Sequence, residues 1–364
     1  MHRSLLAAAA ISFVAACGGS ASKDSTTAGA NQPGAQTFTR SGADLTGAGA
    51  TFPYPLYAKW FDAYATKTGV KINYQSIGSG GGIRQLSEQT VDFGATDAPM
   101  SDAELGKAKG GAVLHFPTAL GAVVVIYNLP SLTTPLKLTG EVLAAIFQGQ
   151  ITKWNDARIA SLNAGAALPA TDILVVHRAE ASGTTYIFSD YLTAVSPAWS
   201  SGPGKGKELK WPVGLGGKGN DGVSGQVKQT PGTIGYVELA YANQNKLPVA
   251  KIKNAAGQFV VPTIESITAA AAGAVEKLPP TTDYRVSIVN APGAAAYPIS
   301  SFTWLLMYQK QTDATKAKKL TDFLQWALTD GEGSAGALDY APLPEALSKQ
   351  LLEKLASIQG GTAS

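Results

Sequence analysis

The stretch VVHRAEASGTTYIF, residues 175–188, decides the fold class because it spans a complete junction between a strand and a helix. The apolar run at 173–176 is typical of a buried β-strand, whereas Ile187, Tyr191 and Leu192 recur at the spacing of a helix. Three similar junctions precede it, and short β-type runs alternate with helical patterns along the chain. This alternation predicts an α/β protein whose sheets are mostly parallel.

The loop of this junction contains side chains of the kind that bind or transform a ligand. Arg178, Glu180 and the run Ser182-Gly183-Thr184 follow the strand directly. Ser182 or Thr184 alone would be an ordinary N-cap of the helix. A charged Arg at the mouth of the loop is not explained by capping, so we consider it a candidate binding residue.

Two earlier junctions add further hydrogen-bond donors. In LTGAGATFPYPLYAKW, Thr51 and Phe52 lie at the start of a predicted helix. In VKINYQSIGSGGGIRQL, a strand at 70–77 runs into a glycine-rich loop around Ser79, and we expect the next helix to start near Ile83. The free N–H groups of such a helix start attract anions. The loop is not a P-loop, because the Gly-Lys-Ser/Thr ending is missing.

The remaining junction, VDFGATDAPMSDAEL, contributes a carboxylate. A short strand at 91–95 ends just before Asp97, and Ser101 and Glu104 have the spacing of a capping box. Asp97 therefore lies in a loop between a strand and a helix, where an isolated Asp is usually a turn or capping residue.

In a parallel α/β sheet such junctions gather at the carboxyl edges of the strands, where ligands bind. Brought together, the hydroxyls, the helix-end N–H groups and Arg178 would form a donor-rich cage around a small tetrahedral anion. Asp97 is the discordant member, since its charge would repel an anion.

The composition excludes several other classes of function. The net charge of +3 is too small for a nucleic-acid binder, which usually carries a concentrated basic patch. Cys17 is the single cysteine, and His2, His115 and His177 lack the spacing of a zinc site. We therefore expect no disulfide in the folded part, no metal ion or other cofactor, and no nucleic-acid partner.

The N-terminus has the layout of a signal peptide. A basic start, a short apolar stretch and small residues lead to Cys17, and VAAC at 14–17 resembles a bacterial lipobox. We expect a lipoprotein signal at 1–17 with Cys17 acylated; the alternative is a plain secretory signal with an incidental Cys. Residues 18–40 are rich in Ser, Thr, Ala and Gly, which predicts a flexible tether. The protein would then be periplasmic or at the cell surface, anchored to a membrane.

Five motifs in fixed order carry a resemblance to a known family. They are LTGAGATFPYPLYAKW, NYQSIGSGGG, VDFGATDAPMS, RAEASGTT and TPGTIGYVE. Together they closely resemble the periplasmic phosphate-binding proteins of bacterial phosphate-specific ABC transporters, over nearly the whole chain from about Asp44. The resemblance implies a two-lobed protein that closes on phosphate by hinge motion, has no catalytic activity and docks on the membrane subunits of the transporter. We expect it to be a monomer.

The resemblance also implies which residues bind phosphate, through side chains or backbone N–H groups. They are Thr51, Phe52, Ser79, Asp97, Arg178, Ser182, Gly183 and Thr184. Glu180 holds the place of an acid that pairs with the Arg, where family members often carry Asp. Gly80 stands where some members have a second Ser or Thr. The segment GKGNDGVSGQV, 218–228, also matches the family, but we assign no direct ligand to it.

The resemblance gives Asp97 a purpose, because phosphate keeps at least one proton near neutral pH and donates it to the carboxylate. Sulfate has no proton, and the juxtaposition of like charges costs several kcal/mol. An Arg fork and a handful of charge-assisted hydrogen bonds, each worth roughly 1.5–3 kcal/mol, suffice for micromolar affinity.

The length of 364 residues favours two lobes. We predict one lobe at 41–117 plus 292–364 and the other at 118–291. A strand in VLHFPTALGAVVVIYN would lead into the second lobe, and YPISSFTWLLMY would lead back.

Two alternatives remain from the residues. The first is a hydrolase or phosphotransferase with Ser182 as nucleophile, His177 as base and Glu180 as its partner, although no nucleophile elbow GxSxG is present. The second is a binding protein for another tetrahedral oxyanion, such as sulfate, molybdate or arsenate.

Overall fold

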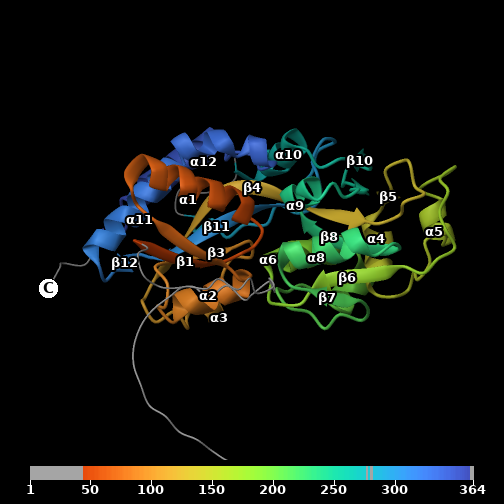
Figure 1. Cartoon of the computed structure of the whole chain (residues 1–364), viewed down its shortest axis with the longest axis horizontal. Helices are drawn as coiled ribbons and strands as arrows, with labels where there is room; N and C mark the ends of the chain where they lie inside the picture. Colours follow the sequence, from red (N-terminus) through yellow and green to blue (C-terminus); the bar gives the residue numbers. More distant parts are fainter. Residues whose placement is uncertain (1–43, 276–277, 279–281, 361–364) are drawn as a thin grey trace, which may run out of the picture. The chain divides into compact units, whose positions relative to one another are not determined.

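The computed structural model describes residues 44–275, 278 and 282–360. The predicted signal peptide at 1–17, its Cys17 and the tether at 18–40 lie outside these residues. Helices and strands alternate along the described chain (Figure 1), which confirms the predicted α/β class. None of the helices in this part of the chain combines the length and the apolar character needed to cross a bilayer.

Eight strands form one continuous sheet in the order β2-β1-β3-β11-β4-β8-β6-β7. Their bounds are β1 Leu45–Gly49, β2 Ile72–Ser76, β3 Phe93–Thr96, β4 Val113–Tyr127, β6 Leu174–Arg178, β7 Leu215–Gly217, β8 Thr233–Glu238 and β11 Ser300–Tyr308. Two small sheets contain β5 Lys137–Leu138, β9 Lys251–Lys253 and β10 Phe259–Val260, and β12 Lys310–Gln311 and β13 Gln359–Gly360.

Helices pack on the strands of the large sheet. Their bounds are α1 Tyr54–Thr68, α2 Ser79–Ser87, α3 Asp102–Leu105, α4 Gly140–Phe147, α5 Ala157–Ala160, α6 Gly183–Val195, α7 Pro197–Ser201, α8 Gly219–Gln229, α9 Leu239–Gln244, α10 Ile264–Val275, α11 Ala314–Ala327 and α12 Glu345–Leu355, with 3₁₀ turns at Asp330–Ser334 and Gly336–Leu338. In Figure 1, α1 and α11 lie on one side of β1 and β3, and α2 and α3 lie on the other.

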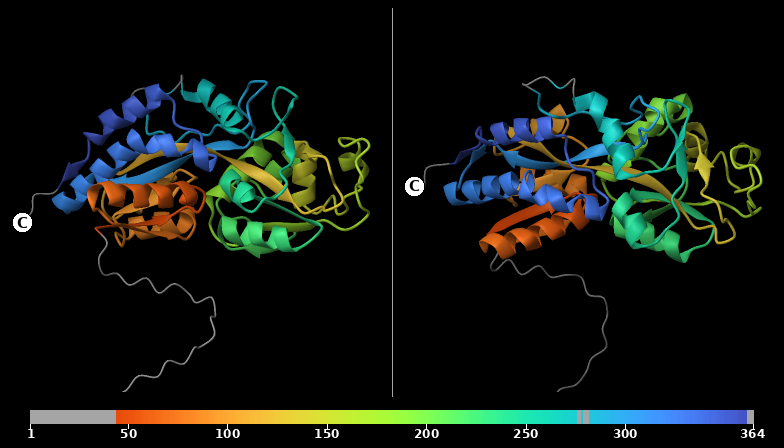
Figure 2. Two further views of the ribbon diagram at one scale, coloured as in Figure 1. Left: turned by 45° about the horizontal axis from the view of Figure 1, so that its top comes forward. Right: turned by 90° about the horizontal axis from the view of Figure 1, so that it is seen from above.

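The sheet consists of two sets of parallel strands joined by two antiparallel ones. β1, β2 and β3 pair in parallel, and so do β6, β7 and β8. Between them, β4 pairs with β11 along residues 113–122 and with β8 along residues 123–127, antiparallel in both cases. Figure 2 shows the orange and blue elements gathered around the first set and the green elements around the second.

The register along β4 makes the two sets face each other. Through β11, Thr96 at the end of β3 lies level with Pro117, whereas Glu238 at the end of β8 lies opposite Val123. β3 runs toward Val123 and β8 runs toward Pro117, so their carboxyl ends point at each other across six residue steps, or about 20 Å. The loops that follow both sets of parallel strands therefore enter the same space.

The chain follows the course expected for two lobes. β4 carries it from the first set of strands to the second, and β11 brings it back so that α11 packs on β1 and α1. The exact division, 41–117 plus 292–364 against 118–291, is not tested by these pairings and stays a prediction.

One local expectation was wrong: α2 begins at Ser79, not near Ile83. The glycines that follow Ser79 form the first turn of the helix instead of a loop. The reason is close packing, because a Cβ on Gly82 would lie 2.4 Å from the Gly49 Cα and 2.5 Å from the Ala48 carbonyl oxygen. Only glycine lets α2 approach the end of β1 so closely.

Gly82→Ala should therefore lower the free energy of unfolding by about 1–3 kcal/mol, the usual range for an overpacked site. Gly225→Ala is the matched control, since Gly225 also lies inside a helix, α8, but its added Cβ meets no atom within 4 Å. That control should be neutral or stabilising by about 0.5–1 kcal/mol, because Ala is the better helix former. Urea unfolding of both variants measures the difference, and equal effects would contradict the close approach.

Candidate functional site

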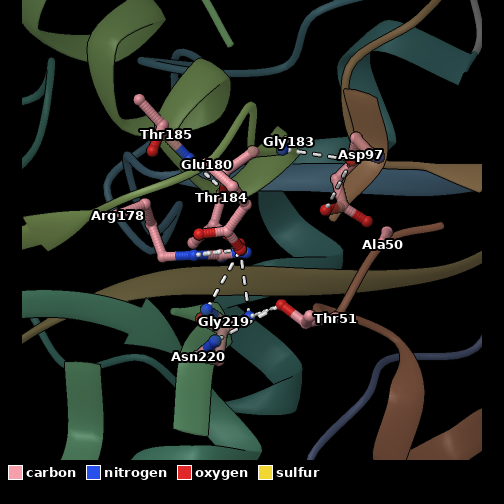
Figure 3. Close-up of polar contacts among 12 residues, drawn as sticks. Ala50, Thr51, Asp97, Arg178, Glu180, Gly183, Thr184, Thr185, Gly219 and Asn220 are labelled. Atoms are coloured by element: carbon pink, nitrogen blue, oxygen red, sulfur yellow. Dashed lines mark hydrogen bonds and ion pairs between the residues drawn. The ribbon is translucent and has the colours of Figure 1, made fainter. Parts of the chain in front are cut away.

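The loops at the facing strand ends bring together the residues predicted from the sequence. Thr51 and Phe52 follow β1, and Ser79 and Asp97 follow β2 and β3. From the other set, Arg178 is the last residue of β6, and Ser182, Gly183 and Thr184 start α6. All of these residues are buried, and none of their side chains is more than 4% exposed. In Figure 3, the labelled residues converge from the two sides.

Ser79 lies where the two sides touch. Its Oγ accepts a hydrogen bond from the backbone N–H of Asp97 at 3.2 Å and from that of Gly183 at 3.1 Å. Its own hydroxyl has the Asp97 Oδ2 as a distant acceptor at 3.5 Å. A Cβ on Gly183 would lie 2.5 Å from both Ser79 Oγ and Asp97 Oδ2, so glycine is needed at this position.

Further contacts bridge the same two sides. The Gly80 N–H donates to the Ala181 carbonyl oxygen at 3.0 Å. Lys207 Nζ lies 2.8 Å from Glu104 Oε2 in a partly buried ion pair. The structure thus has the first and second sets of loops in direct contact.

Asp97 is 1% exposed, and its burial raises the pKa of the carboxyl to about 7. A hydrogen bond from Thr303 Oγ1 to Oδ1 at 2.8 Å, the charge of Arg178 and the Ser79 hydroxyl favour the ionised form, but they do not offset the loss of hydration. Sequence reasoning missed Thr303. It lies in β11 beside Trp304, where the register with β4 shifts at a bulge, and bulges often re-aim side chains next to functional sites.

Arg178 is held by the residues around it. Its Nε donates to Glu180 Oε1 at 3.1 Å and its Nη2 forms an ion pair with the same oxygen, while Nη1 donates to Thr184 Oγ1 at 3.0 Å. The Gly219 N–H also donates to Glu180 Oε1 at 3.0 Å. The Glu180 side chain thus reaches the guanidinium and fixes the position of its planar fork.

Asn220 is a site residue that sequence reasoning did not assign. It is the second residue of α8, in the first turn after β7, and its side chain is fully buried. Its Nδ2 donates to Thr51 Oγ1 at 2.8 Å and to Thr184 Oγ1 at 3.3 Å (Figure 3). The signal was present in GKGNDG, which forms another junction between a strand and a helix.

Tyrosine hydroxyls hold the backbone at the first junction. Tyr241 donates to the Thr51 carbonyl oxygen and Tyr340 to the Phe52 carbonyl oxygen, each at 2.6 Å. Because the C=O and N–H of one peptide point in opposite directions, the bond to the Thr51 carbonyl turns the Phe52 N–H away from Tyr241. These two bonds therefore fix the orientation of the loop in this structure.

The residues of the hydrolase alternative have other contacts. The His177 ring stacks on Trp211 with centroids 4.7 Å apart, and its Nδ1 lies 2.9 Å from the Arg178 carbonyl oxygen. Ser182 Oγ accepts a hydrogen bond from the Thr185 N–H at 3.2 Å as the N-cap of α6. Within the described part of the chain, no cluster of His, Cys, Asp and Glu is suited to hold a metal ion.

Comparison with known structures confirms the two-lobed α/β fold. A phosphate-binding protein from Stenotrophomonas maltophilia aligns with a TM-score of 0.69 at 20% sequence identity, covering 85% of this chain and 93% of that chain.

Sequence comparisons show the family. A family model described as a PBP superfamily domain matches residues 21–331. The phosphate-binding protein PstS of Xylella fastidiosa (strain 9a5c) is 46% identical over 336 residues, covering 91% of this chain and 91% of the relative. The phosphate-binding protein PstS of Pasteurella multocida (strain Pm70) is 46% identical over 315 residues, covering 86% and 90%. With this similarity over most of its length, the chain belongs to the PBP superfamily and, within it, to the family of the PstS phosphate-binding proteins.

Proposed function

We propose that the protein binds inorganic phosphate outside the cytoplasm and delivers it to an ABC-type importer, without catalysing a reaction. The proposal is carried by one observation: a buried cation, several hydroxyl donors and the buried Asp97 carboxyl, whose pKa is raised, converge from two facing sets of strands. The relatives are named phosphate-binding proteins, which supports this proposal.

The hydroxyl of Ser79 and the guanidinium of Arg178 can donate hydrogen bonds to an oxyanion but cannot accept further ones. A hydroxyl has two lone pairs and one proton. Both lone pairs of Ser79 Oγ accept backbone N–H groups, from Asp97 and Gly183, so this hydroxyl has a proton left to give and no lone pair left to receive. Arg178 adds charge-assisted donors in a planar fork, which matches the geometry of phosphate oxygens.

Asp97 selects an anion that still carries a proton. When ionised, its carboxylate accepts the proton of a phosphate oxygen but repels the bare oxygen of sulfate. Its Oδ1 is occupied by Thr303, so Oδ2 is the atom that we assign to the ligand. The ligand residues of the proposal are those of the sequence analysis: Thr51, Phe52, Ser79, Asp97, Arg178, Ser182, Gly183 and Thr184, with Glu180 holding Arg178.

A ligand bound from both sides favours the closed arrangement. Thr51, Ser79 and Asp97 come from the first set of strands, and Arg178 and Thr184 from the second. Contacts that exist with both sets at once stabilise closure over opening, which is a shift of population by differential binding. We further propose that the protein works as a monomer and is tethered to a membrane through acylated Cys17.

Titration calorimetry with phosphate and with sulfate tests the function. Phosphate should bind with micromolar or tighter affinity. Sulfate needs a protonated Asp97, whose pKa is about 7, so its binding should weaken about tenfold for each pH unit above 7. Below that pH the carboxyl keeps its proton and donates it, so the advantage of phosphate should be smallest in acid. Absence of phosphate binding would overturn the function, and equal binding of sulfate at about pH 8.5 would overturn the role of Asp97.

Arg178→Ala should weaken phosphate binding roughly 10- to 150-fold, the equivalent of one charge-assisted contact of about 1.5–3 kcal/mol. The loss also leaves the Glu180 carboxylate without its cation. Arg158→Ala is the matched control, because Arg158 forms an exposed ion pair with Asp156 on the surface. Affinities from the same titration compare the two variants, and a wild-type affinity for Arg178→Ala would remove this residue from the site.

The lipid anchor has a separate test. Replacing the acylated thiol in Cys17→Ala should move the protein from the membrane fraction to the soluble fraction, because the acyl chains would be lost. Fractionation of cells and immunodetection measure the distribution. A variant that remains in the membrane fraction would contradict the anchor without touching the binding proposal.

A further inference from the structure

The Asn220 side chain forms hydrogen bonds with three residues. Its Oδ1 accepts a hydrogen bond from the Glu238 N–H at 3.0 Å, at the end of β8. Its Nδ2 donates to Thr51 Oγ1 at 2.8 Å and to Thr184 Oγ1 at 3.3 Å. With its side chain fully buried, the amide makes all of these bonds away from water.

The Glu238 N–H decides which way the amide faces. A backbone N–H is a donor, so it requires the oxygen of the amide and not its nitrogen. Turning the amide over would place two donors against each other and would face Thr51 and Thr184 with an acceptor. The nitrogen of Asn220 is therefore directed at both hydroxyls.

The hydrogen bonds that the Thr51 and Thr184 hydroxyls accept leave only one direction in which each hydroxyl proton can point. Thr51 Oγ1 accepts from the Asn220 Nδ2 and, at 3.4 Å, from the Asn220 backbone N–H. Thr184 Oγ1 accepts from the Asn220 Nδ2 and, at 3.0 Å, from Arg178 Nη1. Because both lone pairs of each hydroxyl are filled, each proton is free for an acceptor that is not part of this network.

The two hydroxyls also come from opposite sides of the site. Thr51 follows β1 in the first set of strands, whereas Thr184 lies in α6 beside the second set. One amide group therefore contacts both sides at once. Its two N–H groups reach both hydroxyls only when the sides are together.

We propose that Asn220 is a positioning residue of the phosphate site: it turns the hydroxyl protons of Thr51 and Thr184 toward the ligand and does so in the closed arrangement. The inference rests on the proposed function. Asn220 need not touch phosphate, because it acts through the two threonines. Filling the same volume without a donor would not replace it.

Asn220→Ala and Asn220→Asp test this role through the affinity for phosphate. Asn220→Ala should weaken binding about tenfold or more at every pH, because both hydroxyls become free to rotate. Asn220→Asp should weaken it more strongly at about pH 8, since its carboxylate accepts from the threonines and draws their protons away from the ligand. Relative to wild type, that loss should shrink as the pH falls and the new carboxyl gains a proton. Titration calorimetry at several pH values gives each ratio.

A double variant separates positioning from mere packing. If Asn220 acts through Thr51, the loss for Asn220→Ala combined with Thr51→Val should be smaller than the product of the two single losses. Independent effects that multiply in full would overturn the inference. So would a wild-type affinity for Asn220→Ala, or a loss for Asn220→Asp that does not change with pH.

Asn254→Asp is the matched control for a buried amide. Asn254 is 5% exposed, and its Nδ2 donates to the carbonyl oxygens of Gly293, Ala294 and Ala296. This variant should lower the melting temperature and leave the phosphate affinity as in wild type. Wild-type protein that binds no phosphate would refute the proposed function itself, whereas binding by wild type with unaltered variants would refute only the role of Asn220.

Discussion

The site depends on a constraint of register: two sets of parallel strands point their carboxyl ends at each other over the middle of β4. β3 ends level with Pro117 and β8 ends opposite Val123, on a strand shared by both halves of the sheet. Helix starts and loops from both sets consequently fill one space. Residues as far apart in the chain as Thr51 and Asn220, which are 169 positions apart, thereby become hydrogen-bonded neighbours.

The charge states of the site residues follow from their burial between the two sets of strands. Burial removes water from Asp97 and from the Arg178 side chain, which makes an unpaired charge at either residue costly. Arg178 is accordingly paired with Glu180, while burial raises the pKa of Asp97 and lets its carboxyl hold a proton near neutrality. The site therefore combines an Arg178 charge that is paired with Glu180 and an Asp97 carboxyl whose charge depends on pH, which suits the proposed binding of an anion that differs from its competitors by a proton.

Sequence reasoning found what is local and missed what is distant. Thr51, Ser79, Asp97 and Arg178 each follow an apolar run and precede a helix, so a short window reveals them. Asn220 comes after β7, a strand of three residues of which two are glycines. No apolar run therefore precedes Asn220 to indicate a strand at this point. Thr303 reaches Asp97 from 206 positions away through a bulge in β11, and no local pattern encodes that contact. The glycines after Ser79 are typical of a loop in a short window of sequence, whereas the packing partner that makes them helical, Gly49, lies in another strand.

The continuity of the sheet decides where the molecule can flex. Because β4 and β11 belong to both halves, opening cannot occur at a loose linker and must bend these two strands themselves. Their weakest stretch lies between the facing strand ends: Pro117 has no N–H to give to the ladder, and the register slips beside Thr303. Phe52 covers Gly121 in the same stretch, where a Cβ would lie 2.6 Å from its ring. The stretch of β4 and β11 with the least regular pairing thus lies directly under Phe52, so any bending of these two strands would also move the loop that carries Thr51 and Phe52.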